Sequence, residues 1–508
     1  MDQIKKIERA LISVFYKDGI DDIAAALTSR GAELLSTGGT YDYLKQRGFE
    51  VKKVEDLTGY PSILGGRVKT LHPKVFGGIL ARRDMDGDRS QMAQYDIPAI
   101  DLVVVDLYPF EEYVAKGASA EDIIEKIDIG GISLIRAAAK NYKDVVIVPC
   151  QRLYGKLLEC LTAHDGGTTL AEREGFAKWA FAVSSNYDTA IFRYLNRDGE
   201  VEAFAFNSLE STPLRYGENP HQGAAYYGGT ATLPRQLHGK EISYNNMLDI
   251  EAAIELIDDF DSTALAIIKH NNACGCAVRG TVLDAWKDAL AGDPVSAFGG
   301  IIVTNAPVDA AVAEEINKIF FEVIIAPGYS SDALEILKGK KNRIILERGD
   351  VKPSEVKFRS MLGGALVQHR DTVAESAADL TPVTTKTPTE SQTSDLLFAN
   401  RLVKHSKSNA IVLAKGGMLL ASGIGQTSRV DALRQAIAKA RSFGFDLNGA
   451  VMASDAFFPF PDCVEIAAEA GITAVIHPGG SIRDGESIDF CNAHGVAMVT
   501  TGKRHFKH

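Results

Sequence analysis

Short apolar runs that alternate with segments of helical periodicity are the feature that most constrains the fold of this chain. Residues 100–108 (IDLVVVDLY) and 144–149 (DVVIVP) are nearly continuous apolar runs, which is typical of strands buried on both faces of a parallel sheet. Residues 20–30 place apolar side chains at helical spacing and end at Gly31. The first part of the chain is therefore predicted to be α/β, with a doubly wound parallel sheet.

A second set of strand candidates follows after residue 196. They are residues 264–270, 299–305, 409–415, 449–455, 473–479 and 496–502. Between residues 371 and 393, seven threonines and two prolines predict a loop or internal linker. Thr387, Pro388 and Glu390 match the start of a helix. We expect two domains, residues 1–196 and 197–508, the second made of two α/β halves.

Composition excludes several classes of protein. No apolar run approaches the roughly 20 residues that span a bilayer, and the N-terminal segment lacks the pattern of an export signal. Six cysteines in 508 residues are too few for a disulfide scaffold, so a cytoplasmic protein is expected. A formal net charge of −11 argues against a nucleic-acid surface. It leaves open phosphorylated small molecules, which a few cations and N–H groups bind locally.

Three glycine-containing segments of the first domain favour anion binding. Residues 36–40 (STGGT) form a glycine turn before a predicted helix, residues 65–74 (GGRVKTLHPK) combine glycines with cations, and residues 128–142 open a helix with a glycine pair. Such backbones let N–H groups approach an anion. Each segment has a plain alternative: an empty turn, a solvated basic loop, or a surface stripe of cations that includes Arg136 and Lys140. Their coincidence favours phosphate binding.

In the second domain, Lys269 and His270 end an apolar run. A histidine at a strand end of an α/β fold lies where ligands bind, and a neighbouring lysine would assist proton transfer, although such a histidine can also be structural. Cys274 and Cys276 form only C-x-C, and the chain contains no H-x-E. A zinc deaminase site is therefore not expected, and these cysteines are predicted to be buried thiols.

Other segments of this domain combine polar and aromatic residues. Residues 214–222 (LRYGENPHQ) have no periodicity, and residues 423–431 (GIGQTSRVD) pair glycines with an arginine. Residues 454–462 (SDAFFPFPD) could form a core corner or an aromatic wall for a flat heterocycle. The basic tail, residues 502–508, could be frayed or could clamp a phosphate.

Together these segments resemble one family, the bifunctional phosphoribosylaminoimidazolecarboxamide (AICAR) formyltransferase/IMP cyclohydrolases. The shared motifs occur in the family's order: SxGGT, GGRVKTLHP, LYPF, DIGG, RAAAKN, RYGxNPHQ, KHxNxCG, SNAIVLAK, GxGQxSRVD and DAFFPF. The resemblance implies a methylglyoxal-synthase-like N-terminal cyclohydrolase domain. It also implies a cytidine-deaminase-like C-terminal formyltransferase domain, without zinc.

The resemblance further implies two reactions. A formyl group moves from the cosubstrate 10-formyltetrahydrofolate to the 5-amino group of AICAR, and formyl-AICAR then closes to IMP with loss of water. No catalytic metal is implied, and the family forms homodimers with formyltransferase sites at the interface. Two other functions remain open: an enzyme of one activity with a regulatory N-terminal domain, and a nucleotide-binding protein without activity.

The resemblance also assigns residues to roles. The cyclohydrolase catalytic positions are Lys69, Tyr108, Asp128 and Lys140. The nucleotide contacts of this domain are Lys17, Thr37, Gly38, Gly39, Thr40, Arg67 and Thr70. The formyltransferase catalytic positions are Lys269, His270 as the proton acceptor, and Asn409. Its ribotide contacts are Arg215, Tyr216, His221, Gly299, Glu322, Arg429, Phe457 and Arg504, and its folate contacts are Ser481 and Ile482.

The chain departs from the family pattern at four places. Residues 15–19 read FYKDG where the family has SDKTG, and Asp106 stands where the family has an amide. Glu322 replaces an aspartate, and Pro461 replaces an arginine. None of these changes removes a proposed catalytic group.

Overall fold

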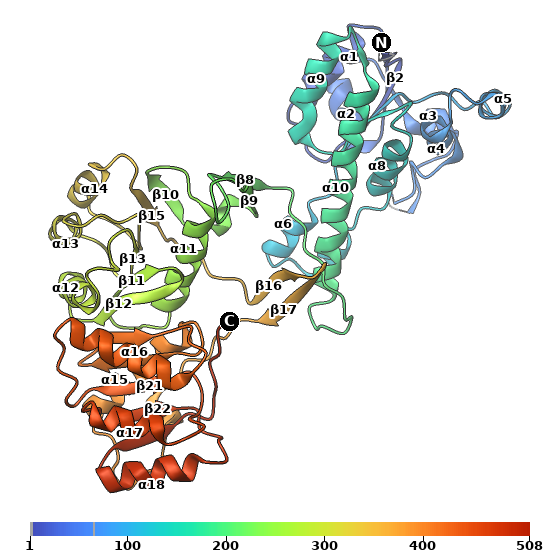
Figure 1. Ribbon diagram of the computed structural model, residues 1–508. Helices are drawn as coiled ribbons and strands as arrows, with labels where there is room; N and C mark the ends of the chain where they lie inside the picture. The colour runs from blue at the N-terminus through green and yellow to red at the C-terminus, as the bar shows by residue number, and fades with distance from the viewer. Residues whose placement is uncertain (1–3, 65–66) are drawn as a thin grey trace. The chain divides into compact units, whose positions relative to one another are not determined.

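The computed structural model describes residues 4–64 and 67–508, and the chain divides into two units, Met1–Leu209 and Glu210–His508 (Figure 1). Each unit has its own sheet and its own hydrophobic core. Within the described residues, no helix has the length and apolar character that crossing a membrane requires.

The boundary between the units falls later than the sequence predicts. Helix α10 (Leu170–Leu195) ends near the predicted boundary at residue 196. The segment that follows folds back onto this helix, where the Asn207 side chain donates a hydrogen bond to Ser185 Oγ at 2.8 Å. Residues 197–209 therefore stay with the first unit.

The first unit is organised around a five-stranded sheet in the order β4-β3-β2-β5-β6, and all of its strand pairs are parallel. The strands are β2 (Arg9–Ser13), β3 (Glu33–Ser36), β4 (Val51–Lys53), β5 (Leu102–Val105) and β6 (Val146–Val148). The chain runs outward from β2 on one side and returns to β5 on the other. The switch point therefore lies between β2 and β5, and ligands of such sheets bind beyond the carboxyl ends of these strands.

Helices and short elements surround this sheet. They are α1 (Ile20–Thr28), α2 (Gly38–Gln46), α3 (Val54–Thr58), α4 (Pro73–Leu80), α5 (Asp86–Gln94), α6 (Phe110–Ala115), α7 (Ala120–Ile124), α8 (Gly130–Lys140), α9 (Tyr154–Ala163), α10, η2 (Gln151–Leu153) and the pair β1 (Lys5–Lys6) and β7 (Gly167–Thr168). Helix α1 matches the predicted helix, and Gly31 follows it with a φ of 81°. Gly38 and Gly39 were predicted as a turn before a helix. They form the first turn of α2 instead.

The second unit is built on one twelve-stranded mixed sheet. In spatial order its strands are β10 (Arg235–His238), β15 (Ile344–Glu347), β14 (Val323–Ala326), β13 (Ile301–Thr304), β11 (Ala264–Lys269), β12 (Asn272–Val278), β20 (Met418–Gly423), β19 (Ile411–Lys415), β21 (Val451–Ser454), β22 (Ala474–His477), β23 (Ala497–Thr500) and β18 (Thr381–Pro382). One pattern occurs twice: an antiparallel hairpin, a strand antiparallel to it, and two parallel strands. The two predicted halves are thus present, and they join where β12 pairs with β20.

Helices cover both faces of this sheet. They are α11 (Tyr244–Ile257), α12 (Val282–Gly292), α13 (Ala310–Ile316), α14 (Ser331–Lys338), α15 (Glu390–Lys404), α16 (Arg429–Ser442), α17 (Asp462–Glu469) and α18 (Asp484–His494). Helices α11 and α15 pack on one face, while α12–α14 and α16–α18 cover the other face of the two halves (Figure 1). The remaining elements are β8 (Ser211–Leu214), β9 (Ala224–Tyr227), η3 (Thr230–Thr232), β16 (Val356–Met361), β17 (Gly364–His369) and η4 (Ala377–Asp379).

The threonine-rich segment contributes to the fold at both of its ends. Strand β18 lies within it and pairs with β23 at the edge of the sheet. Helix α15 begins at Glu390, because Thr389 is its N-cap: Thr389 Oγ1 accepts from the Gln392 N–H at 3.2 Å, and Gln392 Oε1 accepts from the Thr389 N–H at 2.9 Å. The predicted N-cap at Thr387 is wrong by two residues, since Thr389 and Gln392 offer the same capping spacing.

Candidate active sites

The loops after β2, β3 and β5 meet at the carboxyl-end edge of the first sheet. Ser13 Oγ and Thr37 Oγ1 lie 2.9 Å apart in a hydrogen bond between the first two loops. The Phe15 ring packs edge-on against Tyr108, with ring centroids 5.9 Å apart. The fold therefore brings the predicted residues Lys17, Thr37 and Tyr108 to one edge.

The first turn of α2 is open to an anion. Thr37 is its N-cap, but the Thr37 side chain makes no capping hydrogen bond. Thr40 Oγ1 instead donates to the Val14 carbonyl at 2.8 Å and accepts from the Val14 N–H at 3.1 Å. The N–H groups of Gly38 and Gly39 lie at the positive end of the helix, an arrangement that binds phosphate.

Two lysines flank this end of α2. A Cβ added to Gly38 would lie 3.8 Å from Lys69 Nζ, and Lys17 Nζ donates to carbonyl groups of its own loop. Burial lowers the pKa of Lys17, the Asp106 carboxylate opposes this effect, and the Lys69 cation adds to it. Two neighbouring cations beside a helix N-terminus are suited to a dianion such as a phosphate monoester.

Asp128 lies near Lys69, just before α8. Its carboxylate accepts from the Gly131 N–H at 2.6 Å, and its own N–H donates to Tyr187 Oη at 2.9 Å. Burial raises the pKa of Asp128, while N–H donors and the Lys69 cation oppose that rise. Burial and the Asp128 charge raise the pKa of Tyr108. Lys69, Tyr108 and Asp128 therefore form one interacting cluster.

A glycine is required at residue 131 for this arrangement. A Cβ there would lie 2.7 Å from Asp128 Oδ2, which is closer than side chains tolerate. The second glycine of the DIGG motif thus lets the carboxylate approach the helix N-terminus. This is a packing reason for the motif in addition to any anion contact.

Asp106 connects two departures from the family pattern. Its Oδ1 accepts from the Phe15 N–H, and its Oδ2 accepts from the Tyr16 N–H at 3.0 Å. Phe15 and Tyr16 begin the FYKDG segment. A carboxylate supplies both acceptors, whereas an amide has only one acceptor oxygen. Burial raises the pKa of Asp106, and these N–H donors and the Lys17 cation oppose the rise.

Lys140 does not join the cluster around Asp128. It is the last residue of α8, which runs from the carboxyl-end edge of the sheet back to the opposite edge, as a crossover between parallel strands must. At 1.5 Å per residue, its backbone lies about 15 Å from Gly130. Among the described residues, no hydrogen bond or ion pair links Lys140 to Asp128 or Lys69.

The segment before α4 is only partly described, because residues 65–66 lie outside the described residues. Thr70 is buried and lies at the start of α8, where a Cβ on Gly130 would be 3.1 Å from Thr70 Oγ1. The Arg67 side chain forms an ion pair with Glu125. Thr70 is thus placed beside the cluster.

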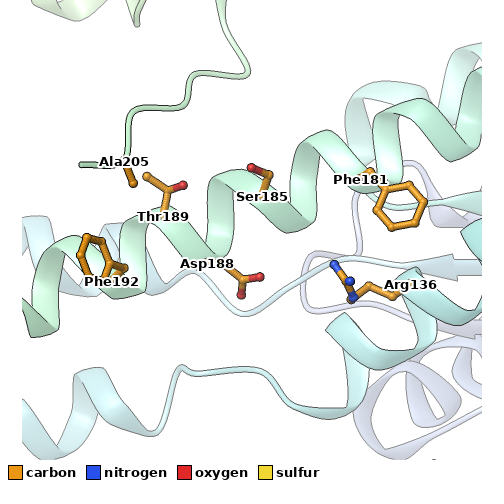
Figure 2. A pocket seen from close by; sticks show the side chains of 7 residues that line it. All are labelled: Arg136, Phe181, Ser185, Asp188, Thr189, Phe192 and Ala205. Atoms are coloured by element: carbon orange, nitrogen blue, oxygen red, sulfur yellow. The ribbon is translucent and has the colours of Figure 1, made fainter. Parts of the chain in front are cut away.

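Arg136 packs against α10 beside a hollow of about 540 Å³ (Figure 2). Its guanidinium donates to Ser184 Oγ at 3.2 Å and lies 5.6 Å from the Phe181 ring centroid. The hollow is lined by Arg136, Phe181, Ser185, Asp188, Thr189, Phe192 and Ala205. Of the two interpretations of the cations on α8, this packing favours a surface stripe for Arg136.

In the second unit, Lys269 lies at the end of β11. Its Nζ donates to the Phe298 carbonyl, and a Cβ on Gly299, whose φ is 72°, would lie 3.5 Å from it. The exposed rings of Phe298 and Phe320 pack together with centroids 5.2 Å apart. A lysine, a glycine in the left-handed region and two exposed rings therefore surround this strand end.

His270 and Asn271 form the hairpin turn between β11 and β12. Both have positive φ, 49° and 64°, as both central residues of a type I′ turn do. The corresponding turn between β19 and β20 uses Gly416 and Gly417, with φ of 59° and 66°. The first half therefore has a histidine in the left-handed turn position where the second half has a glycine.

Asp249, which the sequence analysis missed, supports this turn. It accepts from the Asn271 N–H at 2.6 Å. Burial raises the pKa of Asp249, and the Asn271 N–H, His270 and Lys269 oppose the rise. Asp249 lies within a helix and outside any recognisable motif, so no local signal marks it.

Asn409 is held from several directions. Its Oδ1 accepts from Arg429 Nη2 at 2.8 Å. The same guanidinium donates to Asp455 Oδ1 and to the Phe457 carbonyl, each at 3.1 Å. Asp455 is 1% exposed, and its Oδ2 accepts from the Ala410 N–H at 3.1 Å. Asp455 was also missed as a site residue, although it is the last residue of a predicted strand and lies in the SDAFFPFPD segment.

Asn409 and the His270 turn lie at the same edge of the sheet. Each strand in the series β11, β12, β20 and β19 is antiparallel to the next, so β19 runs opposite to β11. The end of β11 and the start of β19 therefore lie at the same edge of the sheet. Three strand spacings place them about 14 Å apart. Asn272 Oδ1 accepts from the Lys407 N–H at 2.9 Å and joins the two segments.

The remaining predicted ribotide and folate contacts differ in their hydrogen-bond partners and in their exposure. The Tyr216 carbonyl accepts from the Tyr244 N–H at the start of α11, and Arg215 donates to Tyr216 Oη at 2.8 Å. Glu322 forms an ion pair with Lys240 at 2.5 Å. Three predicted contacts are exposed, His221, Ile482 and Arg504, while Ser481 is half-buried.

Within the described residues, no group of three or more His, Cys, Asp or Glu side chains could hold a metal ion. Cys274 and Cys276 are buried free thiols, as predicted. Pro461, at the fourth departure from the family pattern, is the N-cap residue of α17.

Comparison with known proteins gives consistent matches over the whole chain. The family model described as AICARFT/IMPCHase bienzyme matches residues 138–439, and that of the MGS-like domain matches residues 19–133. The bifunctional purine biosynthesis protein PurH of Bacteroides thetaiotaomicron is 64% identical over 100% of both chains. The PurH of Aquifex aeolicus is 48% identical over 98% of this chain and 100% of the relative. That of Persephonella marina is 46% identical over 98% and 99%.

Proposed function

This chain belongs to the AICARFT/IMPCHase bienzyme family, and on that premise we propose which of its residues carry each reaction. It is a bifunctional AICAR formyltransferase and IMP cyclohydrolase, which performs the last two steps of purine synthesis. We assign ring closure to the first unit and formyl transfer to the second. The observation that supports this division is that each unit has its own cluster of interacting polar residues at one sheet edge.

For ring closure, the first turn of α2 and Lys17 would hold the phosphate of formyl-AICAR. The carboxamide nitrogen attacks the formyl carbon, a carbon–nitrogen bond forms, and negative charge develops on the formyl oxygen. Lys69 is suited to stabilise that charge. The carbon–oxygen bond then breaks and water leaves, with one proton taken from the carboxamide nitrogen and one from the formamido nitrogen. Asp128, whose pKa is raised by burial, is suited to accept the amide proton, and Tyr108 to pass a proton to the leaving oxygen.

For formyl transfer, the 5-amine of AICAR attacks the formyl carbon of 10-formyltetrahydrofolate. A carbon–nitrogen bond forms there, the bond from that carbon to N10 of the folate breaks, and the amine proton passes to N10 through His270. Lys269 would stabilise the developing oxyanion, and Asn409 would hold the carboxamide or the formyl oxygen. No metal takes part in either proposed step.

Lys140 lies apart from the other proposed catalytic residues of ring closure. The family resemblance supports a role in ring closure, while its position at the far end of α8 does not. A role of Lys140 in ring closure therefore requires a test separate from that of Lys69, Tyr108 and Asp128.

We also propose that the chain is a homodimer with formyltransferase sites at the interface, and that it works in the cytoplasm. The exposed Phe298, Phe320 and Ile482 support the first part, because apolar groups beside a site are suited to contact a partner or a flat substrate. We further propose that Ser481 and Ile482 contact the folate, and that the two halves share the cytidine-deaminase-like fold.

The test is to follow tetrahydrofolate and IMP separately. We expect Lys69→Ala to slow ring closure of supplied formyl-AICAR by about a hundredfold without changing formyl transfer. His270→Ala should slow formyl transfer by about a hundredfold or more without changing ring closure. Unchanged ring closure in Lys69→Ala would favour a regulatory role for the first unit, and unchanged formyl transfer in His270→Ala would refute the proposed proton acceptor.

A further inference from the structure

The C-terminal tail borders Asn409 on two sides. The Ser408 N–H donates to the Lys507 carbonyl at 2.9 Å, and the Lys507 N–H donates to Ser408 Oγ at 3.1 Å. The His505 N–H donates to the Asp455 carbonyl at 3.2 Å. Asp455 in turn binds the backbone on the other side of Asn409 and the arginine that holds its amide.

His505 ties this tail to the body of the second unit. It is 3% exposed, with Nδ1 2.7 Å from Asp371 Oδ2 and Nε2 2.9 Å from Glu375 Oε1. Glu375 is equally buried, and its Oε2 accepts from Asn400 Nδ2 at 2.9 Å. These four residues form a continuous hydrogen-bonded chain from the tail to α15.

The hydrogen bonds define the protonation state of His505. Both ring nitrogens face carboxylate oxygens, and only the imidazolium donates from both nitrogens. Burial alone would lower the pKa of His505, but the hydrogen bonds that His505 donates to Asp371 and Glu375 outweigh burial and raise that pKa to about 9. The histidine is thus a cation clamped by two carboxylates, and its ring has one permitted orientation.

A buried charge cluster is a poor means of adding stability alone, because desolvation offsets much of the attraction between the charges. An apolar side chain would hold a tail equally well but with less defined geometry. The tail carries Arg504, a proposed ribotide contact, and it borders Asn409, so a defined geometry matters at this place. Orientation is therefore the better explanation of the cluster.

We propose that His505 is a positioning residue for formyl transfer: clamped by Asp371 and Glu375, it fixes the C-terminal tail, and the tail holds Asn409 and Arg504 at the site. This proposal rests on the role of Asn409 assigned above. His505 acts through these residues and contacts neither substrate.

The test uses the full-length chain and its two activities. His505→Gln removes the cation and one of the two donors. We expect kcat for formyl transfer to fall about tenfold to a hundredfold, as for a misplaced catalytic group, while ring closure of supplied formyl-AICAR stays unchanged. Asp371→Asn should lower the same kcat, and the double variant should fall no further than His505→Gln, because both changes break one clamp.

A matched control is Arg348→Met, which breaks the Arg348–Asp258 pair at the opposite edge of the sheet, where the guanidinium donates at 2.7 Å. The proposal is overturned if His505→Gln lowers kcat for formyl transfer no more than Arg348→Met does when both variants lose the same amount of Tm. It is also overturned if the fold-decrease of kcat in the double variant equals the product of the fold-decreases in the two single variants. If His505→Gln does not fold, the half-exposed Asp371→Asn decides by the same comparison. Full activity in Asn409→Ala would instead refute the role of Asn409.

Discussion

Asp106 and the loop of Lys17 form one structural feature. The two carboxylate oxygens of Asp106 accept hydrogen bonds from the N–H groups of Phe15 and Tyr16. These two residues directly precede Lys17, the proposed phosphate contact. Viewed in the sequence alone, the aspartate and the FYKDG segment are two unrelated departures from the family. Their contact shows that a second acceptor oxygen at residue 106 serves the backbone of this particular loop.

We therefore expect Asp106→Asn to destabilise the loop. One N–H loses its acceptor, which costs about 0.5–1.5 kcal/mol because these hydrogen bonds are exposed or half-buried, and KM for formyl-AICAR should rise because Lys17 is less well placed. The measurements are thermal unfolding and ring-closure kinetics. Asp42→Asn, the same change at an exposed residue of α2, is the control. Equal behaviour of the two variants would show that the second oxygen is unimportant.

The sequence offers candidate site residues where a motif is continuous, but not where the contacts come from distant segments. Lys269 and His270 stand out because a polar pair ends an apolar run. His505 does not stand out, because its partners Asp371 and Glu375 lie more than a hundred residues earlier. The motif around Lys140 makes it a candidate residue, but only the course of α8 shows that Lys140 lies at the far end of this helix from Asp128.

At the scale of elements, the hairpin turns of the second unit combine function with backbone strain. His270 and Asn271 occupy the left-handed region, where a side chain costs about 1–2 kcal/mol per residue relative to glycine. The other half places Gly416 and Gly417 in the equivalent turn. A costly residue is thus used in the turn to which the proton acceptor is assigned.

This comparison predicts a difference between two variants of one residue. His270→Gly and His270→Ala both remove the imidazole, so formyl transfer should fall to the same level in both. His270→Gly should be about 1 kcal/mol more stable than His270→Ala, because only glycine relieves the positive φ. Denaturant unfolding measures the difference, and Gly416→Ala should lose a similar amount. Equal stabilities would mean that the turn relaxes in the variants.

The apolar runs predict β5 and β6 of the first sheet and six strands of the second, β11, β13, β19, β21, β22 and β23, because complete burial on two faces leaves a clear compositional signature. Strands β14, β15 and β20 are also buried but were not predicted. The order of the strands in each sheet is harder to predict from the sequence. The pairing of β12 with β20, which merges two halves into one sheet, depends on a single pair of residues, Ala277 and Met418. Helix starts are set by local competition, and the T-x-x-Q spacing at Thr389 displaced the predicted start at Thr387.

At the scale of the whole molecule, the two units carry separate sheets and cores. The clusters around Asp128 and Asn409 are each built from residues of one unit. Neither cluster needs a residue of the other unit for the hydrogen bonds described above. The two reactions should therefore be separable by substitution.

We expect a mixture of Lys69→Ala and His270→Ala chains to convert AICAR to IMP much faster than either chain does alone, because each variant alone is slowed about a hundredfold in one step. Formyl-AICAR released by the first variant supplies the second, so IMP should appear after a lag that shortens as the His270→Ala concentration rises. The measurement is IMP formation against time with 10-formyltetrahydrofolate in excess. Accumulation of formyl-AICAR without IMP in the mixture would contradict this independence.

The repeat within the second unit also bears on the ancestry of the chain. In each half, the hairpin turn lies at one edge of the sheet. The residues that follow the other three strands of that half lie at the opposite edge. Arg279 donates to the Gly416 carbonyl at 2.8 Å, and Asn305 accepts from the Ala264 N–H as Asp455 does from Ala410. This likeness of the two halves is what duplication of one half within a single gene would produce. The two edges now differ in that one hairpin turn holds a histidine and the other a glycine.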